Sequence, residues 1–285
     1  MIDLSHVKGL LFTPGTRPDR FAKAEATRAS GVIIDLEDAV GPGDKDGARA
    51  AVAGWFRGRT APTRPGFLVC VRINSVYTGA GLRDLLMLTE LLRDGITPDA
   101  VVLPKVESAV EVGMVARHLQ NKVALITLIE SALGLEQAMA IAAAAFSVRA
   151  VAFGGVDLAA DLRCELAWEP LLAARARVVQ AAASRGLGAL DVPYLDIDDA
   201  AGLAAECARA RAMGFSGKLA IHPSQAGAIA DAFIPSAAQV EHAQGVLDSY
   251  TAAGGGVCTY RGKMIDEPVV LAARHTLARA AGATQ

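Results

Sequence analysis

Eight short runs of apolar and β-branched residues recur along the chain, and longer Ala-, Leu- and Arg-rich stretches of helical periodicity separate them. Successive runs begin about 22 to 37 residues apart, which is enough for a strand, a helix and two loops. This alternation is typical of repeated βα units around a parallel sheet. The runs are LLFT (10–13), VIIDLED (32–38), FLVCVRI (67–73), AVVLPK (100–105), VALITLIE (123–130), AVAFGG (150–155), LGALDV (187–192) and KLAIHP (218–223).

Polar or charged residues stand where these runs end. A closed barrel brings all its strand ends to one face, where its active site is assembled, whereas an open doubly wound sheet gathers only some of them. We therefore predict a TIM (β/α)₈ barrel over residues 1–225, followed by a C-terminal helical segment over 226–285 in the same domain. The run-end residues are Thr13, Glu37 with Asp38, Arg72, Lys105, Glu130, Asp157, Asp191 and His222.

The C-terminal segment contains the most linker-like stretch of the chain, TAAGGGVCTYRGKMIDEP at 251–268, with three consecutive glycines. Such flexibility suits a terminal helix that moves as a lid or reaches a neighbouring subunit. Asp266 near its end is predicted first as the N-cap of the final helix, with Pro268 in the first turn. A second role, as an acid/base group that the helix delivers to the site, stays open.

Composition excludes several classes of protein. The formal net charge is −2 and the sequence pI is about 6.2, so no broad basic surface is available for nucleic acid or an anionic membrane. The four cysteines lie far apart without zinc-ligand spacing, which is typical of reduced thiols. No signal peptide is recognisable at the N-terminus, and no apolar stretch is long enough to span a bilayer. We expect a cytoplasmic protein.

Glu130 ends the fifth run and Asp157 follows the sixth. Adjacent strands lie about 4.8 Å apart, so two acidic side chains at their ends can reach one ion and leave most of its coordination sphere open. Oxygen ligands with open positions suit Mg²⁺. Either acid alone is equally well explained as a helix cap, but the pair on neighbouring strands favours a metal site.

Arg72 belongs to an apolar strand, where an unpaired guanidinium is costly to bury. It either pairs with Glu37 or Asp38 or is directed at a substrate carboxylate or enolate, and the two roles are compatible. Glu37 and Asp38 themselves are a strand-end carboxylate pair that anchors a loop or belongs to the site. The glycines that follow them do not have dinucleotide-loop spacing.

Two further positions have mainly structural interpretations. Ser108 and Glu111 have the spacing of a capping box, which predicts a helix start. His222, between a strand and Pro223, is expected in a turn or in the wall of the site. Lys105, at a strand end, is a lesser functional candidate.

The motifs taken together resemble the citrate lyase beta-subunit and malyl-CoA lyase family, also called the HpcH/HpaI or CitE-like group, over nearly the whole chain. Each motif is weak alone, but their order and spacing are specific. They are LFTPGTRPDRFAKA, DLEDAV, VRIN, LPKVE, LIESALG, FGGVDLAADL, GKLAIHPSQ and GKMIDEPVV.

The resemblance implies a Mg²⁺-dependent carbon–carbon lyase that cleaves or forms a citryl-, malyl- or citramalyl-type thioester. It implies Mg²⁺ on Glu130 and Asp157, substrate and enolate on Arg72, and Asp266 as an acid/base group supplied by an adjacent subunit of a trimer or hexamer. Coenzyme A, as part of the substrate, is implied near Phe12, Ile221 and His222, with Lys23 as a phosphate contact.

Three alternatives remain within this resemblance. The chain could be a malyl-CoA-type thioesterase, an aldolase for 4-hydroxy-2-oxo acids, or the beta subunit of a citrate lyase complex that receives its acyl group on an acyl carrier protein. Lys8-Gly9 replaces Arg-Ser of many relatives, and Val156 replaces an acidic residue beside the metal aspartate. These departures point to a different substrate preference with the metal ligands retained.

Overall fold

Eight parallel strands close into one barrel, in the order of the sequence, with β1 paired to both β2 and β8. The computed structural model describes residues 2–59 and 64–281. The strands coincide with the eight predicted runs: β1 (Gly9–Pro14), β2 (Gly31–Asp35), β3 (Leu68–Arg72), β4 (Ala100–Leu103), β5 (Ala124–Ile129), β6 (Val148–Phe153), β7 (Gly188–Asp191) and β8 (Gly217–Ala220). The prediction of a TIM barrel is confirmed.

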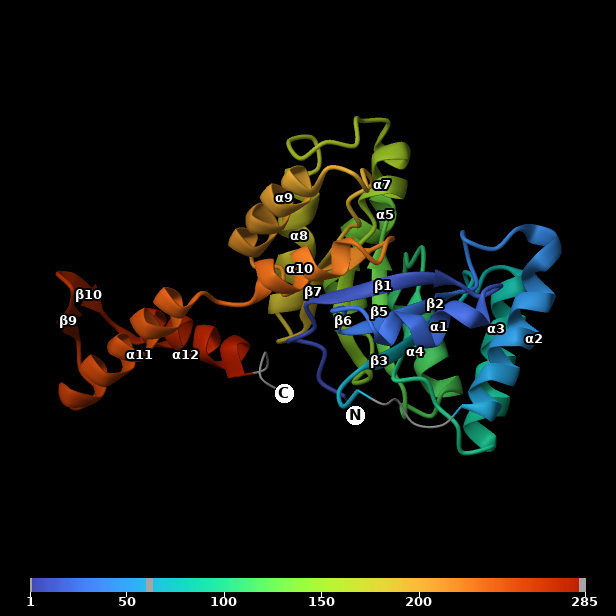
Figure 1. Ribbon diagram of the computed structural model, residues 1–285, viewed down its shortest axis with the longest axis horizontal. Coiled ribbons are helices and arrows are strands. Elements are labelled where there is room, and N and C mark those ends of the chain that lie inside the picture. Colours follow the sequence, from blue (N-terminus) through green and yellow to red (C-terminus); the bar gives the residue numbers. More distant parts are fainter. Residues whose placement is uncertain (1, 60–63, 282–285) are drawn as a thin grey trace. The chain divides into compact units, whose positions relative to one another are not determined.

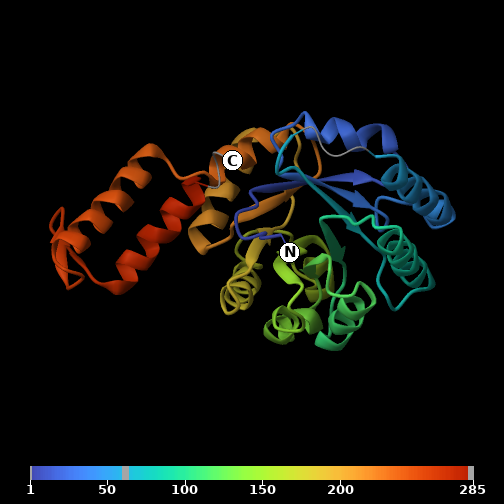
Figure 2. The same ribbon diagram turned by 90° about the horizontal axis from the view of Figure 1, so that it is seen from below.

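Helices cover the outside of the barrel (Figures 1 and 2). Ser108 and Glu111 form the predicted capping box at the start of α4, and Ser131 caps α5. The helices of this part are α1 (Pro18–Glu25), the 3₁₀ turn η1 (Pro42–Asp44), α2 (Lys45–Gly58), α3 (Gly79–Arg93), α4 (Ala109–His118), α5 (Ala132–Glu136), α6 (Ala138–Ala142), α7 (Gly155–Leu162), α8 (Leu172–Ala183), α9 (Ala200–Met213) and α10 (Gln225–Phe233).

Two compact units make up the chain, residues 1–230 and 231–285, and their boundary falls within α10. In the second unit α11 (Ala237–Ala252) packs on α12 (Glu267–Ala281) around a small core of Ala243, Val246, Ile265, Val270 and Ala273. Whether this unit acts as a lid stays a prediction.

Part of the expected linker at 251–268 is ordered, which corrects the sequence interpretation. Cys258–Tyr260 (β9) and Lys263–Ile265 (β10) form an antiparallel hairpin. Its two turn residues, Arg261 and Gly262, have φ of 49° and 75°, the positive values that a two-residue hairpin requires. Glycine adopts such values without strain, so glycine in this stretch indicates a turn as well as flexibility.

Side-chain alternation along each strand decides what faces the barrel interior. Leu10, Ile33 and Cys70 belong to the buried interior cluster, so the residues two positions further, Phe12, Asp35 and Arg72, point inward as well. The lower interior is packed with apolar side chains, while these next positions line an open pocket. The same two-residue period therefore builds both the core and the site.

The intervening residues point outward, and this explains why Asp191 does not belong to the site. Its Oδ2 binds Lys218 Nζ at 2.7 Å and its Oδ1 accepts a hydrogen bond from Arg175 Nε at 3.0 Å. Lys218 also pairs with Glu206 of α9 at 2.6 Å, so the network ties β7 and β8 to α8 and α9. The expectation that all run-end polar residues face one active site is wrong at Asp191.

Replacing Lys218 should be strongly destabilising, because it leaves Asp191 and Glu206 without their shared cation. We expect Lys218→Met to lower the free energy of unfolding by about 3 kcal/mol or more, measured by urea denaturation. The exposed pair of Arg209 and Glu169 is the matched control, since Glu169→Gln should lower the free energy of unfolding far less. Equal effects of the two substitutions would contradict the assignment.

Candidate active site

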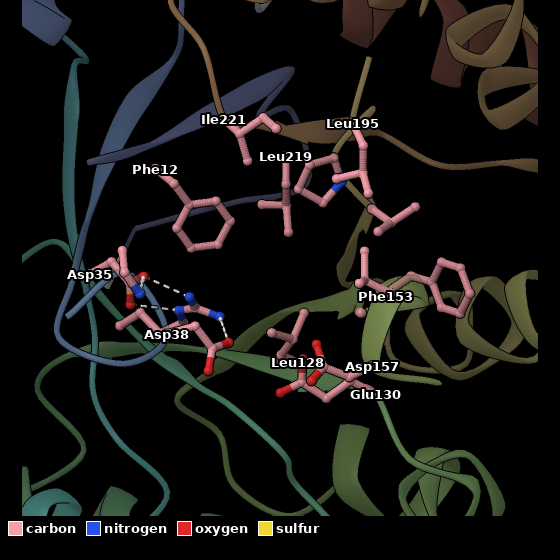
Figure 3. A pocket seen from close by; sticks show the side chains of 16 residues that line it. Phe12, Asp35, Asp38, Leu128, Glu130, Phe153, Asp157, Leu195, Leu219 and Ile221 are labelled. Atoms are coloured by element: carbon pink, nitrogen blue, oxygen red, sulfur yellow. Dashed lines mark hydrogen bonds and ion pairs between the residues drawn. The ribbon is translucent and has the colours of Figure 1, made fainter. Parts of the chain in front are cut away.

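A pocket of about 360 Å³ opens at the carboxyl ends of the barrel strands. One part of its lining is acidic and the remainder is almost entirely apolar (Figure 3). The polar residues are Asp35, Asp38, Arg72, Glu130 and Asp157, and the other lining residues are Phe12, Ala39, Leu128, Phe153, Gly154, Val156, Val192, Pro193, Leu195, Leu219 and Ile221.

Arg72 is held between carboxylates from the end of β2. Its Nε and Nη2 donate to the two oxygens of Asp35 at 2.7 and 2.6 Å, in a bidentate pair fixed by the register that places Asp35 opposite Arg72. Its Nη1 lies 2.9 Å from Glu37 Oε2 and 3.4 Å from Asp38 Oδ2. Burial alone would lower the pKa of Arg72, but Asp35 above all raises it beyond its usual value.

Asp35 is the partner that the sequence interpretation missed. The interpretation placed the ion pair on Glu37 or Asp38, and both do face Arg72, but Asp35 makes the closest and best-aligned contacts. A signal existed, because Asp35 is an acidic residue two positions after Ile33 in a buried run. It must therefore share the interior face and needs a cation on a neighbouring strand.

Phe12 lies over the guanidinium, with Arg72 Cζ 4.7 Å from the ring centroid. Such a cation–π contact stabilises a partly desolvated arginine and holds the guanidinium plane in place. Ile221 lines the same pocket on the β8 side. Phe12 and Ile221 thus line the wall of the pocket, while their contact with coenzyme A stays a prediction.

Glu130 follows the end of β5, and Asp157 lies in the first turn of α7, after β6. The two side chains lie side by side in the acidic part of the pocket (Figure 3). Glu130 does not cap α5, since Ser131 does. Instead, Glu130 Oε1 accepts a hydrogen bond from the backbone N–H of Lys105 at 2.5 Å. Lys105 achieves this with a left-handed backbone, φ of 50°, and its Nζ binds Glu37 Oε1 at 2.6 Å. One lysine therefore links the two acidic groups of the site.

Space beside Glu130 depends on the absence of a side chain at Gly154. A Cβ there would overlap the Glu130 side chain and lie 2.6 Å from its Oε2. No side chain caps the start of α7, and Gly154, Val156 and Asp157 at this helix start line the pocket. The site therefore offers two carboxylates for a cation and a helix N-terminus that accepts an anion.

Burial raises the pKa of Glu130 to about 8, with the negative charges of Glu37 and Asp157 adding to the effect. This excess of negative charge, open on the pocket side, fits a divalent cation. Nowhere in residues 2–59 and 64–281, this pocket included, do three His, Cys, Asp or Glu side chains come together as a metal-binding group, so Glu130 and Asp157 offer two carboxylates only. A cation at Glu130 and Asp157 would keep most of its positions for water or substrate oxygens.

Three of the expected residues lie outside this pocket lining, and one more lies in the other unit. Glu37 sits behind Arg72, buried against it and against Lys105. Lys23 is exposed on α1 beside Asp19, and His222 is exposed with its Nδ1 2.7 Å from Ser224 Oγ. Asp266 belongs to the C-terminal unit, where its carboxylate accepts from Val269 N at 3.4 Å as the predicted N-cap.

The sequence of this chain is similar to those of known proteins. Residues 8–223 match the model of the HpcH/HpaI aldolase/citrate lyase family. The chain belongs to this family. One relative is the mitochondrial citramalyl-CoA lyase of Homo sapiens. It is 31% identical, and the match covers 95% of this chain and 84% of the human protein. The citrate lyase subunit beta of Escherichia coli strain K12 is 32% identical over 96% of this chain and 93% of the relative.

The family fold extends to solved structures. The CitE protein of Mycobacterium tuberculosis, solved with magnesium, acetoacetate and coenzyme A, is 36% identical, with a TM-score of 0.80 over 96% of this chain and 97% of that chain. In the described part of this family member, no helix is long and apolar enough to cross a membrane. The four cysteines are free thiols.

The raised pKa of Glu130 has a measurable effect on stability when no divalent cation is present. Folded Glu130 keeps its proton up to about pH 8, whereas the unfolded side chain loses it near pH 4.5. The contribution of this group to the free energy of unfolding is therefore fully present below pH 4.5 and is lost as the pH rises through 8. Between these values, the stability of the wild type relative to Glu130→Gln should fall by up to about 1.4 kcal/mol per pH unit. Urea denaturation with a chelator across pH 5–9 measures this, and a pH-independent difference would mean that Glu130 ionises normally.

Proposed function

We propose that this protein is a Mg²⁺-dependent lyase that cleaves or forms a carbon–carbon bond in a 3-hydroxyacyl thioester of coenzyme A. The observation that carries the proposal is the pair Glu130 and Asp157 in one pocket with Arg72, whose guanidinium is fixed by Asp35. The family supports it, since its named members include citramalyl-CoA lyase and citrate lyase beta subunits. The structure of a relative with magnesium, acetoacetate and coenzyme A supports the choice of cofactor and acyl carrier.

Glu130 and Asp157 would hold Mg²⁺ through their carboxylates. When bound, the ion supplies Lewis acidity toward the carbonyl and carboxylate oxygens of a 2-oxo acid. The backbone of Lys105 orients Glu130 for this role, and Gly154 leaves the carboxylate accessible. The N–H groups at the start of α7, which no side chain caps, would receive the substrate carboxylate next to Asp157.

Arg72 would stabilise the other product of cleavage, the thioester enolate. In the cleavage direction the 3-hydroxyl group gives its proton to solvent water, the bond between the α-carbon and the hydroxylated carbon breaks to leave the 2-oxo acid, and the electron pair passes to the thioester as an enolate. The developing negative oxygen requires a fixed cation in a partly desolvated pocket. Asp35 and Phe12 hold the guanidinium in one orientation, so little reorganisation is needed when this charge forms.

Asp266 is the proposed group that donates a proton to the enolate carbon, and removes it in the reverse direction. We further propose that the protein forms a trimer or hexamer and that the C-terminal unit of one subunit supplies Asp266 to a neighbour. The small apolar core of this unit supports the idea that it is stabilised by packing on another surface. A cytoplasmic location, supported by four free cysteines, is part of the same proposal.

Neutral replacements of the two acids test the metal assignment. Glu130→Gln and Asp157→Asn should each abolish Mg²⁺-dependent turnover of a hydroxyacyl-CoA and weaken Mg²⁺ binding by at least about tenfold, because each removes one of two charged ligands. Calorimetric titration gives the affinity, and circular dichroism verifies the fold. Asp161→Asn, on the α7 turn beyond the pocket lining, is the matched control. Unchanged Mg²⁺ binding in both variants would refute the metal site.

Asp266 is tested by proton exchange and by subunit mixing. Asp266→Ala should bind thioester normally yet stop solvent deuterium exchange at the acyl α-carbon, followed by NMR. If the residue acts across subunits, mixing the inactive variants Glu130→Gln and Asp266→Ala should restore part of the activity, since some sites then combine both native residues. Continued exchange in Asp266→Ala would leave the residue with only its capping role.

A further inference from the structure

A second cavity, of about 180 Å³, lies on the side of the barrel that α8 and α9 cover (Figure 1). Residues of α8, of α9 and of the segment after β7 line it, and the buried Arg175 is among them. The residues that it shares with the candidate active site, Val192, Pro193 and Leu195, are all apolar. We propose that this cavity is a binding site for a small aliphatic monocarboxylate, separate from the candidate active site.

Arg175 is only 2% exposed, yet most of its hydrogen-bonding capacity is unused. Within the described residues its guanidinium makes one hydrogen bond, from Nε to Asp191 Oδ1 at 3.0 Å, and its Nη1 is buried without a partner. Asp191 also binds Lys218 Nζ at 2.7 Å, so this carboxylate serves two cations at once. Unpaired donors on a buried arginine are costly, so a ligand that accepts from them is stabilised strongly.

Two aromatic rings hold this guanidinium in place. Its Cζ lies 4.3 Å from the ring centroid of Trp168 and 5.0 Å from that of Phe153. The edge formed by Nη1 and Nη2 therefore keeps one orientation, and its parallel N–H groups match the two oxygens of a carboxylate. Because the side chain is already fixed, binding a carboxylate there costs little conformational entropy.

Acidic residues in the lining limit the ligand to one negative charge. Glu206 pairs with Lys218 at 2.6 Å, so the four linked groups Arg175, Lys218, Asp191 and Glu206 have no net charge. Asp196 adds an exposed negative charge to the same lining. A first carboxylate meets the unused edge of the guanidinium, whereas a second one in the same ligand would face Glu206 and Asp196 without a cation of its own.

The remaining lining is mostly apolar, and the cavity is small. Leu166 and Leu195 keep 46% and 48% of their surface exposed, so covering them with an alkyl chain is favourable. A volume of about 180 Å³ corresponds to about six water molecules of about 30 Å³ each, so it suits a ligand of about six non-hydrogen atoms. Butanoate combines this size with one carboxylate and an alkyl chain.

Trp168 can report binding directly, because it stacks on Arg175. The chain has two tryptophans, so Trp55→Phe leaves Trp168 as the only indole fluorophore. In this background, with a chelator and without Mg²⁺, butanoate should change the fluorescence saturably, with a Kd of about 1 mM or lower. Butanamide, which lacks the charge, and succinate, which carries two, should each bind at least about tenfold more weakly. Absence of a saturable change with butanoate, or equal binding of either analogue, overturns the proposal.

Filling the cavity distinguishes it from the candidate active site. Ala167→Phe places a ring in the lining and should weaken butanoate binding at least about tenfold. Ala173→Phe, at an exposed position of α8 outside the lining, is the matched control and should bind butanoate as the wild type does. Glu130→Gln should also leave binding unchanged. Loss of binding in Glu130→Gln but not in Ala167→Phe would place the carboxylate in the active site and refute the proposal.

Arg175→Lys tests the guanidinium itself. Lysine keeps a cation beside Asp191 but lacks the edge of parallel donors, so butanoate affinity should fall at least about tenfold. Circular dichroism verifies the fold, and Ala167→Phe decides the question if Arg175→Lys does not fold. Wild-type affinity in a folded Arg175→Lys variant would contradict the assignment. None of these measurements involves Mg²⁺ or a thioester, so their failure leaves the proposed lyase function unaffected.

Discussion

The bidentate pair between Asp35 and Arg72 is the interaction on which the site depends. Both residues point into a closed barrel, where neither charge is tolerated alone, and the register of β2 on β3 sets them opposite one another. Arg72 in turn orders Glu37 and Asp38, and Lys105 bridges these acids to Glu130. The electrostatic framework of the pocket thus extends from one buried pair across four strand ends.

The sequence predicted the barrel and most of the pocket for one physical reason. Strand runs and their polar ends are local features, and closure of the barrel converts their linear order into a ring. Glu130, Asp157, Arg72, Phe12 and Ile221 therefore meet in one pocket as expected. The role of Asp266 stays a prediction, because the placement of its unit relative to the barrel is a long-range property that spacing does not encode.

The errors of the sequence interpretation concerned side-chain direction within a strand and the geometry of a turn. Asp35 was overlooked because the acidic pair after it was more conspicuous, and Asp191 was grouped with the run-end residues of the active-site face although alternation turns it outward. The hairpin at Arg261 and Gly262 was taken for flexible chain, since glycine is common to both. Counting the two-residue period along each run from its buried members would have corrected the first two errors.

The barrel wall is only one strand thick, and this connects the pocket to the helices outside it. Asp191 and Lys218 anchor β7 and β8 to α8 and α9, while their immediate neighbours Val192 and Leu219 form the apolar wall of the pocket. A change in how those helices pack would shift both faces of the same backbone. Selectivity in this protein can therefore drift through substitutions on the outer helices, far from any atom that meets the substrate.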